Sequence, residues 1–331
     1  MNKKYFKFYE SCIPVVGMNR GIIYDLRRGN LYFLPKMVLQ QFDKYSKHET
    51  EKFYSDHEDQ KEVLDKYFNY LIENELIFFL EDRKRFPKIN NKLSIPFILD
   101  VLFLEIDNFD VCKKNLFEND EINKLGCSEI VLISHQSSID NLEQILTFLE
   151  YSKIHNITVI MSYDFGISDK LIELVKNNNR IREVIIFDVD EKIIINDDSN
   201  LKFHKKSLNE ILTKRITDMS DFVPNLNSYL ESLHKNLYFN RKIYIDNNGN
   251  IKHSFEDKTF YGNLKKNNLK NIIELDEFRK LWNVSKDQIE VCKDCEFRYI
   301  CPDNRIPLEK IKGKYFHDTK CNYNPYNNKW E

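Results

Sequence analysis

The chain has 331 residues, of which 42% are hydrophobic and 13% aromatic, and its formal net charge at pH 7 is −2. A chain of this length has room for two or three domains with sizeable cores. The near-neutral charge excludes a bulk electrostatic attraction to nucleic acid or to a membrane surface, so we expect neither as a partner.

The first residues and the apolar runs indicate a cytoplasmic protein. Residues 5–10 alternate in polarity and do not form the apolar core of a signal peptide. The longest apolar stretch, residues 95–106, is interrupted by Asp100 and is too short to cross a bilayer.

Residues 1–90 are expected to form a small α+β module. The strands predicted from their alternation and their β-branched and aromatic content are residues 4–9, 21–26, 31–34 and 76–80. Residues 28–30, Arg-Gly-Asn, supply turn chemistry between two of these strands.

Two helices are predicted in the same module. Pro35 suits the start of a helix that runs from residue 36 to about residue 45. Residues 46–58 are polar and are predicted to form a loop. The apolar side chains of the second helix fall on one stripe: Val63, Leu64, Tyr67, Phe68, Leu71 and Ile72. Residues 81–92 are charged, contain a proline and are predicted to be a linker.

The middle of the chain, residues 91–238, alternates between predicted strands and helices. The predicted strands are apolar runs at residues 96–106, 130–133, 157–161 and 184–187. Asp140 and Glu143 resemble a capping box at the start of one helix, and Ser168 is expected to open the next. Such repeats predict a parallel sheet with right-handed crossovers. They are too few for a closed eight-stranded barrel, so a partial barrel or an open sheet is expected.

Polar residues follow three of these strands. His135, Asp164, Asp188 and Asp190 lie where the carboxyl ends of parallel strands meet, which is where sites form in such sheets. A residual substrate pocket is one interpretation. The simpler one is that these residues end strands and cap helices.

The last third begins with a predicted strand at residues 242–245, a turn at 246–250 and a short helix at 275–282. Four cysteines follow: Cys292, Cys295, Cys301 and Cys321. In a reducing compartment such clustering predicts a metal site rather than disulfides. Thiolates suit zinc or an iron–sulfur cluster, and the spacing alone does not choose between them. The isolated cysteines are expected to be small packing residues: Cys12, Cys112 and Cys127.

The segment from Cys292 to Cys301, Cys-Lys-Asp-Cys-Glu-Phe-Arg-Tyr-Ile-Cys, resembles the core of a SPASM domain. This domain carries auxiliary clusters in radical S-adenosylmethionine (SAM) enzymes that mature peptides. The resemblance implies a 4Fe–4S cluster on the four cysteines. A complete domain has further cysteines where this chain has Arg305 and Ser254, so one cluster is expected rather than two.

A radical-SAM enzyme needs C-x3-C-x2-C just after the first barrel strand, and here only Cys112 follows residues 103–107. The middle domain therefore resembles a radical-SAM barrel without its catalytic cluster, and no use of SAM is expected. The whole layout, including residues 12–17, resembles the SPASM-domain maturase of grasp-with-spasm systems. That resemblance implies a ribosomal precursor peptide and an ATP-grasp ligase as partners.

In that context the amino-terminal module resembles the winged-helix-like recognition element that binds leader peptides. Such elements add the peptide as a strand to an exposed sheet edge. The residues expected to form the groove are Leu31, Tyr32, Phe33, Leu34, Tyr67 and Phe68. A plain cap packed on the barrel is the alternative. A DNA-binding winged helix is disfavoured, because the second helix has only Lys61 and Lys66 as basic residues.

The sequence thus predicts an α/β protein in three parts. They are a winged-helix-like recognition module (residues 1–90), a partial radical-SAM-like barrel (91–238) and a truncated SPASM domain with one cluster site (239–331). The expected function is that of a peptide maturation factor that is not itself a radical-SAM enzyme. The alternatives are an enzyme with its own chemistry at the cluster or barrel pocket, and a structural zinc scaffold.

Overall fold

The computed structural model describes residues 4–331 except 83–85, 87–89, 92, 164–168 and 190–199. Its contacts divide the chain into two compact units. Unit 1 comprises Met1–Ser94, Arg215–Leu237 and Val284–Glu331, and unit 2 comprises Ile95–Lys214 and Tyr238–Asn283. Residues 239–331, expected as one domain, are therefore shared between the two units. The three functional segments expected from the sequence remain a prediction.

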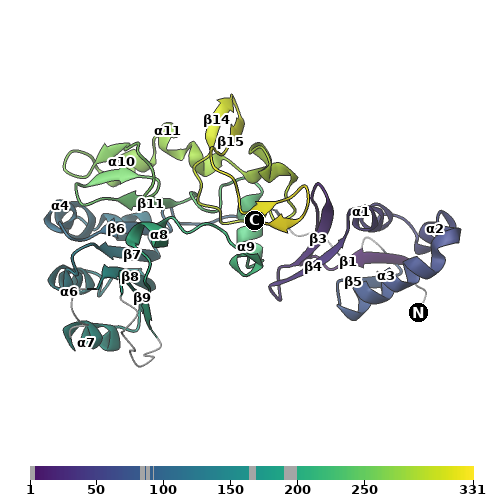
Figure 1. The fold of residues 1–331 in the computed structure, drawn as a ribbon, viewed down its shortest axis with the longest axis horizontal. Helices are drawn as coiled ribbons and strands as arrows, with labels where there is room; N and C mark the ends of the chain where they lie inside the picture. Colours follow the sequence, from purple (N-terminus) through teal and green to yellow (C-terminus); the bar gives the residue numbers. More distant parts are fainter. Residues whose placement is uncertain (1–3, 83–85, 87–89, 92, 164–168, 190–199) are drawn as a thin grey trace. The chain divides into compact units, whose positions relative to one another are not determined.

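The amino-terminal part of unit 1 contains two small sheets and three helices (Figure 1). Its elements are β1 (Tyr5–Phe8), β2 (Cys12–Val16), β3 (Arg20–Asp25), β4 (Asn30–Pro35), β5 (Ile77–Leu80), α1 (Lys36–Tyr45), α2 (Thr50–Ser55) and α3 (Lys61–Glu73). The sheet β2-β3-β4 is antiparallel, with β4 at one edge, and β1 pairs antiparallel with β5.

The turn and the proline act as predicted. Gly29 has φ +73°, a conformation in which a side chain would be strained, and Asp25 accepts the backbone N–H groups of the turn residues Arg27 and Arg28 at 3.1 Å. Pro35 directly precedes α1, where its missing N–H costs nothing.

Two elements of this part were missed from the sequence. The loop prediction for residues 46–58 was wrong, because α2 forms there. Its Phe53 is fully buried and stacks on Tyr45 with ring centroids 4.4 Å apart. Tertiary packing, rather than helical propensity, therefore explains this helix. β2 contains Pro14, which fits because β2 is an edge strand.

An aromatic core holds this part together. The rings of Phe6, Phe42, Phe53 and Phe68 contact one another at centroid distances of 4.9–6.1 Å. The second predicted helix is confirmed as α3, which buries Leu64, Phe68 and Leu71 against this core and leaves Val63 and Tyr70 exposed.

The rest of unit 1 is mostly irregular chain around the four cysteines. Its regular elements are α9 (Leu226–Ser232), β14 (Leu308–Ile311), β15 (Lys314–Phe316), β16 (Tyr323–Asn324) and β17 (Lys329–Trp330). Two hairpins are formed, β14 with β15 and β16 with β17.

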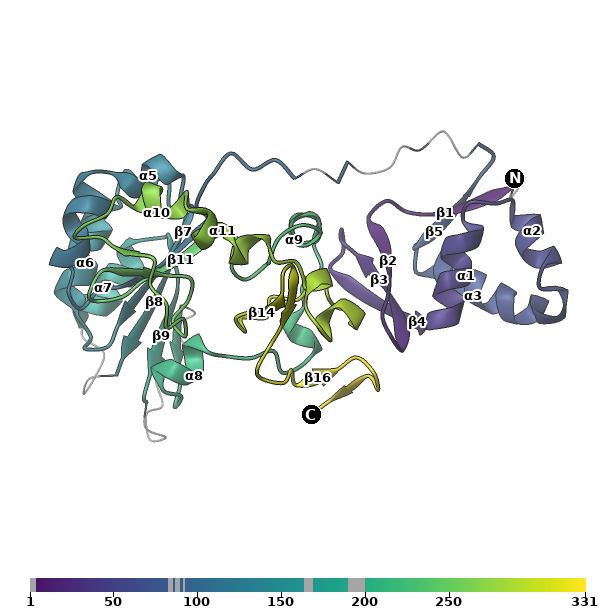
Figure 2. The same cartoon turned by 90° about the horizontal axis from the view of Figure 1, so that it is seen from above.

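Unit 2 is a mixed α/β body with an eight-stranded, mostly parallel sheet (Figure 2). Its strands are β6 (Val101–Glu105), β7 (Glu129–Ser134), β8 (Asn156–Ser162), β9 (Ile181–Phe187), β10 (Leu201–Phe203), β11 (Lys242–Ile245), β12 (Asn250–Lys252) and β13 (Gly262–Asn263). Its helices are α4 (Asp110–Cys112), α5 (Glu121–Leu125), α6 (Ile139–Phe148), α7 (Asp169–Asn177), α8 (Leu208–Leu212), α10 (Leu269–Ile273) and α11 (Asp276–Arg279). The sheet order is β10-β9-β8-β7-β6-β11-β12-β13.

The predicted parallel sheet is confirmed and contains one more strand than expected, whereas one predicted helix cap is wrong. β11 pairs in parallel with β6, so a strand expected in the carboxy-terminal domain belongs to this sheet. The capping box at Asp140 and Glu143 is wrong, because α6 begins after Ser138 and both acidic side chains instead pair with Lys170. Ser168 lies outside the described residues.

One apolar cluster of the sheet contains Ile133, Phe187 and Tyr244, together with Leu208 of α8. Among the described residues, no helix is long and apolar enough to cross a membrane.

Candidate metal centre

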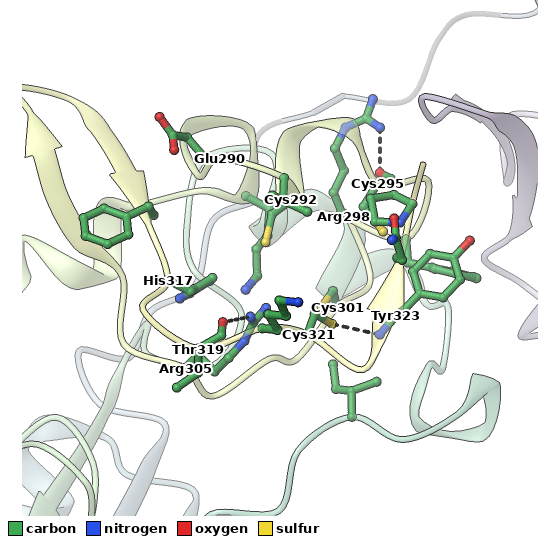
Figure 3. A pocket seen from close by; sticks show the side chains of 18 of the residues that line it. Glu290, Cys292, Cys295, Arg298, Cys301, Arg305, His317, Thr319, Cys321 and Tyr323 are labelled. Atoms are coloured by element: carbon green, nitrogen blue, oxygen red, sulfur yellow. Dashed lines mark hydrogen bonds between the residues drawn. The ribbon is translucent and has the colours of Figure 1, made fainter. Parts of the chain in front are cut away.

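The four predicted cysteine ligands line a single cavity of about 360 Å³ in unit 1 (Figure 3). A space of about 10–15 Å³ holds one water molecule, so this cavity can hold a group of many atoms. The structure thus brings together residues separated by up to 29 positions in the chain, from Cys292 to Cys321.

Tight turns aim these cysteines at the cavity. The N–H of Cys295 donates to the carbonyl of Cys292 at 3.0 Å, which folds the Cys-x2-Cys pair back on itself. The N–H of Tyr323 donates to Sγ of Cys321 at 3.5 Å.

Burial keeps three of these cysteines, Cys292, Cys295 and Cys301, protonated when no metal is bound. It raises the pKa of the Cys292 thiol, raises that of Cys295 well above its usual range and raises that of Cys301 to about 12. Metal binding deprotonates such thiols and so couples the fold of this segment to the metal.

Charged side chains that sequence reasoning missed also line the cavity or lie beside it. Oδ2 of buried Asp303 accepts from Nζ of Lys286 at 2.8 Å and from Nη2 of Arg305 at 2.9 Å. Burial opposes ionisation of Asp303, but the two cations outweigh it and hold the pKa of this carboxyl well below its usual range.

His317 also lines the cavity and was not predicted from the sequence. Its side chain is 3% exposed, and its Nδ1 lies 3.3 Å from the carbonyl oxygen of Ile306. Burial, together with Lys286, lowers the pKa of His317 to about 4, so the ring is neutral at pH 7. Ligand atoms of Cys292, Asp303 and His317 lie within 4.8 Å of one another.

The cysteine segment packs directly on the sheet β2-β3-β4. Buried Glu296 accepts from Nε of Arg20 at 2.5 Å and from the hydroxyl of Tyr323 at 2.5 Å, and its carbonyl accepts from the hydroxyl of Tyr24. A Cβ on Gly17 would lie 2.9 Å from both Cβ and N of Glu296, so only glycine allows this approach.

The residues predicted to form a peptide groove divide between two faces of β4. Leu31 and Phe33 pack toward the cysteine segment. Tyr32 is partly buried on the other face, next to the core formed with α3. The remaining residues belong to that same core, with two of them almost fully buried: Leu34 (4% exposed), Phe68 (3%) and the partly buried Tyr67.

Among the described residues, no strand pairs with the outer side of β4. Leu34 and Phe68 serve the core, and the peptide groove stays a prediction.

Of the polar residues predicted at the carboxyl edge of the parallel sheet, His135 has structural partners. Asp107 accepts from the hydroxyl of Ser134 at 2.7 Å and from the N–H of His135 at 2.9 Å, which orders the loop after β7. Nε2 of His135 lies 3.6 Å from Glu105. Asp188 is exposed, and Asp164 and Asp190 lie outside the described residues. The isolated cysteines are buried, as expected for packing residues: Cys12, Cys112 and Cys127.

No protein-family model matches the sequence, and no curated protein matches it. Among solved structures the chain is similar to Streptococcus suis SuiB, at 13% identity and TM-score 0.37 over 95% of this chain and 99% of that chain. SuiB bound to S-adenosylmethionine (13%, TM-score 0.35) and SuiB bound to precursor peptide SuiA (12%, TM-score 0.35) each match 96% of this chain and 99% of theirs. TM-scores below 0.5 do not establish a common fold.

Proposed function

We propose that this protein is a maturation factor for a ribosomally made peptide, of the grasp-with-spasm type. It binds the precursor peptide at the edge of β4 and holds one 4Fe–4S cluster on Cys292, Cys295, Cys301 and Cys321. The observation that carries the proposal is the convergence of these cysteines on one cavity, in the same compact unit as an open strand edge.

One feature supports an iron–sulfur cluster over zinc: the cavity of about 360 Å³ has room for a group of many atoms. Lys286 and Arg305 also place positive charge beside the thiolates, which suits any metal group that four thiolates hold. A cluster held by four thiolates is an anion, so buried cations stabilise it. Such a cluster supplies electron transfer or structural support.

Two features support peptide binding at β4. The outer edge of the strand offers backbone N–H and C=O groups, which an extended peptide pairs with regardless of its sequence. On α3, Val63, Tyr67 and Tyr70 recur at helical spacing, and Val63 and Tyr70 are exposed. In this proposal these exposed side chains meet alternate side chains of the peptide.

The ATP chemistry is assigned to a partner ligase. The chain has only eight glycines and no glycine-rich motif that cradles phosphates. The chain's own part is to hold the precursor peptide while the ATP-grasp ligase joins its side chains.

The test is a maturation assay with the precursor peptide and the ATP-grasp ligase encoded beside this protein. We expect the ligase, ATP and precursor to give a product that has lost one water per side-chain linkage only when this protein is present. Cys295→Ala should lower both its iron content, from about four per chain, and the yield. Cys127→Ala, at a buried cysteine far from the cavity in sequence, is the control and should retain both.

Full ligase activity without this protein would overturn the proposed function. Stoichiometric zinc and no iron after anaerobic purification would overturn the proposed cofactor.

A further inference from the structure

One ring nitrogen of His317, Nε2, is buried without a hydrogen-bond partner among the described residues. A neutral imidazole has one N–H, yet both ring nitrogens face oxygen acceptors. Nδ1 lies 3.3 Å from the carbonyl of Ile306, and Nε2 lies 3.3 Å from Oδ2 of Asp303 in a geometry that makes no hydrogen bond. With the proton on Nδ1, Nε2 is a buried lone pair without a donor among the described residues.

Asp303 is poorly placed to bind a metal ion together with Nε2 of His317. Its Oδ2 already accepts from Lys286 and Arg305, and its Oδ1 accepts from Nε of Arg305 at 2.9 Å. A divalent ion bound between Asp303 and His317 would also face two buried cations at short range. A separate mononuclear site at this place is therefore unfavourable.

The remaining member of the group is Cys292. Its Sγ and a ring nitrogen of His317 lie within 4.8 Å of each other, and both residues line the cavity of the four cysteines (Figure 3). Two donors bound to one metal ion, with bonds of about 2.3 Å to sulfur and 2.0–2.1 Å to nitrogen, stand about 3.6 Å apart. Small side-chain rotations thus place sulfur and nitrogen at the same metal position.

We propose that His317 is a fifth donor of the cluster site, able to bind through Nε2 the iron that Cys292 binds. The inference rests on the proposed 4Fe–4S cluster. When Nε2 takes this iron, the Fe–Sγ bond breaks, the thiolate of Cys292 keeps the bonding electron pair, and the lone pair of Nε2 forms the Fe–N bond. No electron is gained or lost, and Lys286 remains beside the released thiolate to balance its charge.

The experiment compares four anaerobically reconstituted full-length variants: Cys292→Ala, Cys295→Ala, His317→Ala and Cys292→Ala/His317→Ala. Iron and sulfide are measured, and pulsed electron paramagnetic resonance of the dithionite-reduced protein detects nitrogen bound to the cluster. We expect Cys292→Ala to keep most of its iron and to show a strong ¹⁴N coupling. Cys295→Ala and the double variant should lose most of theirs, and His317→Ala should keep its cluster without ¹⁴N coupling.

Loss of the cluster in Cys292→Ala to the extent seen in Cys295→Ala, or its retention in the double variant, would overturn the fifth-donor inference and leave the proposed cofactor intact. Wild-type protein without iron would overturn both.

A second measurement does not depend on the folding of Cys292→Ala. The wild-type protein with its cluster is treated with iodoacetamide, and the labelled cysteines are identified by mass spectrometry. Because His317 releases Cys292 in a fraction of molecules, Cys292 should be alkylated several times faster than Cys295, Cys301 and Cys321. His317→Ala should remove this difference. Equal rates for all four cysteines in the wild type would contradict the inference.

Discussion

Lys286 is a buried lysine, 4% exposed, and its ammonium group lies beside two of the predicted ligands. Burial disfavours its charge, but Asp303 and the neighbouring cysteines outweigh burial and raise its pKa. The lysine therefore stays charged next to the cluster site. In a region of low dielectric constant, such a charge changes the energy of adding an electron nearby.

We predict that Lys286→Met lowers the reduction potential of the cluster, because the added electron loses a stabilising positive charge. A tenfold loss in the one-electron equilibrium corresponds to about 59 mV, which sets the scale expected. Lys293→Met is the matched control, since Lys293 is exposed although it follows Cys292 directly. A redox titration monitored by paramagnetic resonance measures both. Equal potentials in Lys286→Met and the wild type would show that this lysine does not act on the cluster.

At the residue scale, the sequence predicted the cysteines and missed their neighbours. Cysteine is rare in this chain, and cysteines two to five residues apart can bind one metal group together. Cys292, Cys295 and Cys301 are therefore recognisable as candidate ligands from the sequence alone. Charged residues make up 31% of the chain, so nothing in the sequence separates Lys286 or Asp303 from the solvated majority. Only the fold shows that they are buried.

β4 is the element on which the proposed peptide binding depends. Its inner side pairs with β3 from Asn30 to Pro35, and its outer side is unpaired among the described residues. Binding led by the backbone should depend on the N–H and C=O groups of this edge more than on its side chains.

We therefore predict that Tyr32→Pro weakens precursor binding by at least tenfold, whereas Tyr32→Ala weakens it only a few-fold. Proline lacks the N–H group and restricts the backbone, and it is tolerated on edge strands. Calorimetric titration of the full chain with the precursor peptide measures the affinities, and unchanged iron content shows that each variant is folded. Equal weakening by the two substitutions would mean that the side chain, not the strand edge, binds the peptide.

At the element scale, success in prediction followed the strength of the local signal. β3, β4 and α1 were predicted closely, because a glycine turn and Pro35 mark their ends. α2 was missed, because one buried ring, Phe53, holds a polar segment in helical form. β11 was predicted as a strand, but no local pattern could indicate that it pairs with β6, which lies 141 positions earlier (Lys242 with Val101).

At the scale of the whole molecule, the residues next to the cluster ligands connect the cysteine segment to the sheet β2-β3-β4 within unit 1. We call these contacts of Glu296 and Tyr323 with Arg20 the joint. Glu296 directly follows Cys295, and Tyr323 lies two positions after Cys321. Both contact Arg20 of β3, at 2.5 and 3.2 Å. The same Arg20 guanidinium lies over the ring of Phe33 of β4, 4.1 Å from its centroid. The metal ligands and the sheet with the proposed peptide edge are therefore linked by adjacent residues.

We predict that removing the cluster loosens this joint while the parallel sheet of unit 2 stays intact. Without metal, the segment from Cys292 to Cys321 loses the binding energy that holds its irregular chain, and the contacts of Glu296 with the sheet should weaken with it. Hydrogen exchange followed by mass spectrometry should show faster exchange in β2, β3 and residues 292–324 of the apoprotein, and unchanged exchange in β6–β9.

Gly17→Ala tests the contact between Glu296 and the sheet independently of metal loss. The added Cβ displaces Glu296 and contacts none of the four cysteines. It should speed exchange in β2 and β3 while the iron content stays near that of the wild type. Met18→Ala, at a side chain 52% exposed, is its control and should change neither. Faster exchange throughout β6–β9 of the apoprotein would mean that the metal stabilises the whole chain. Full protection of β2 and β3 would mean that the sheet holds its place without the cysteine segment.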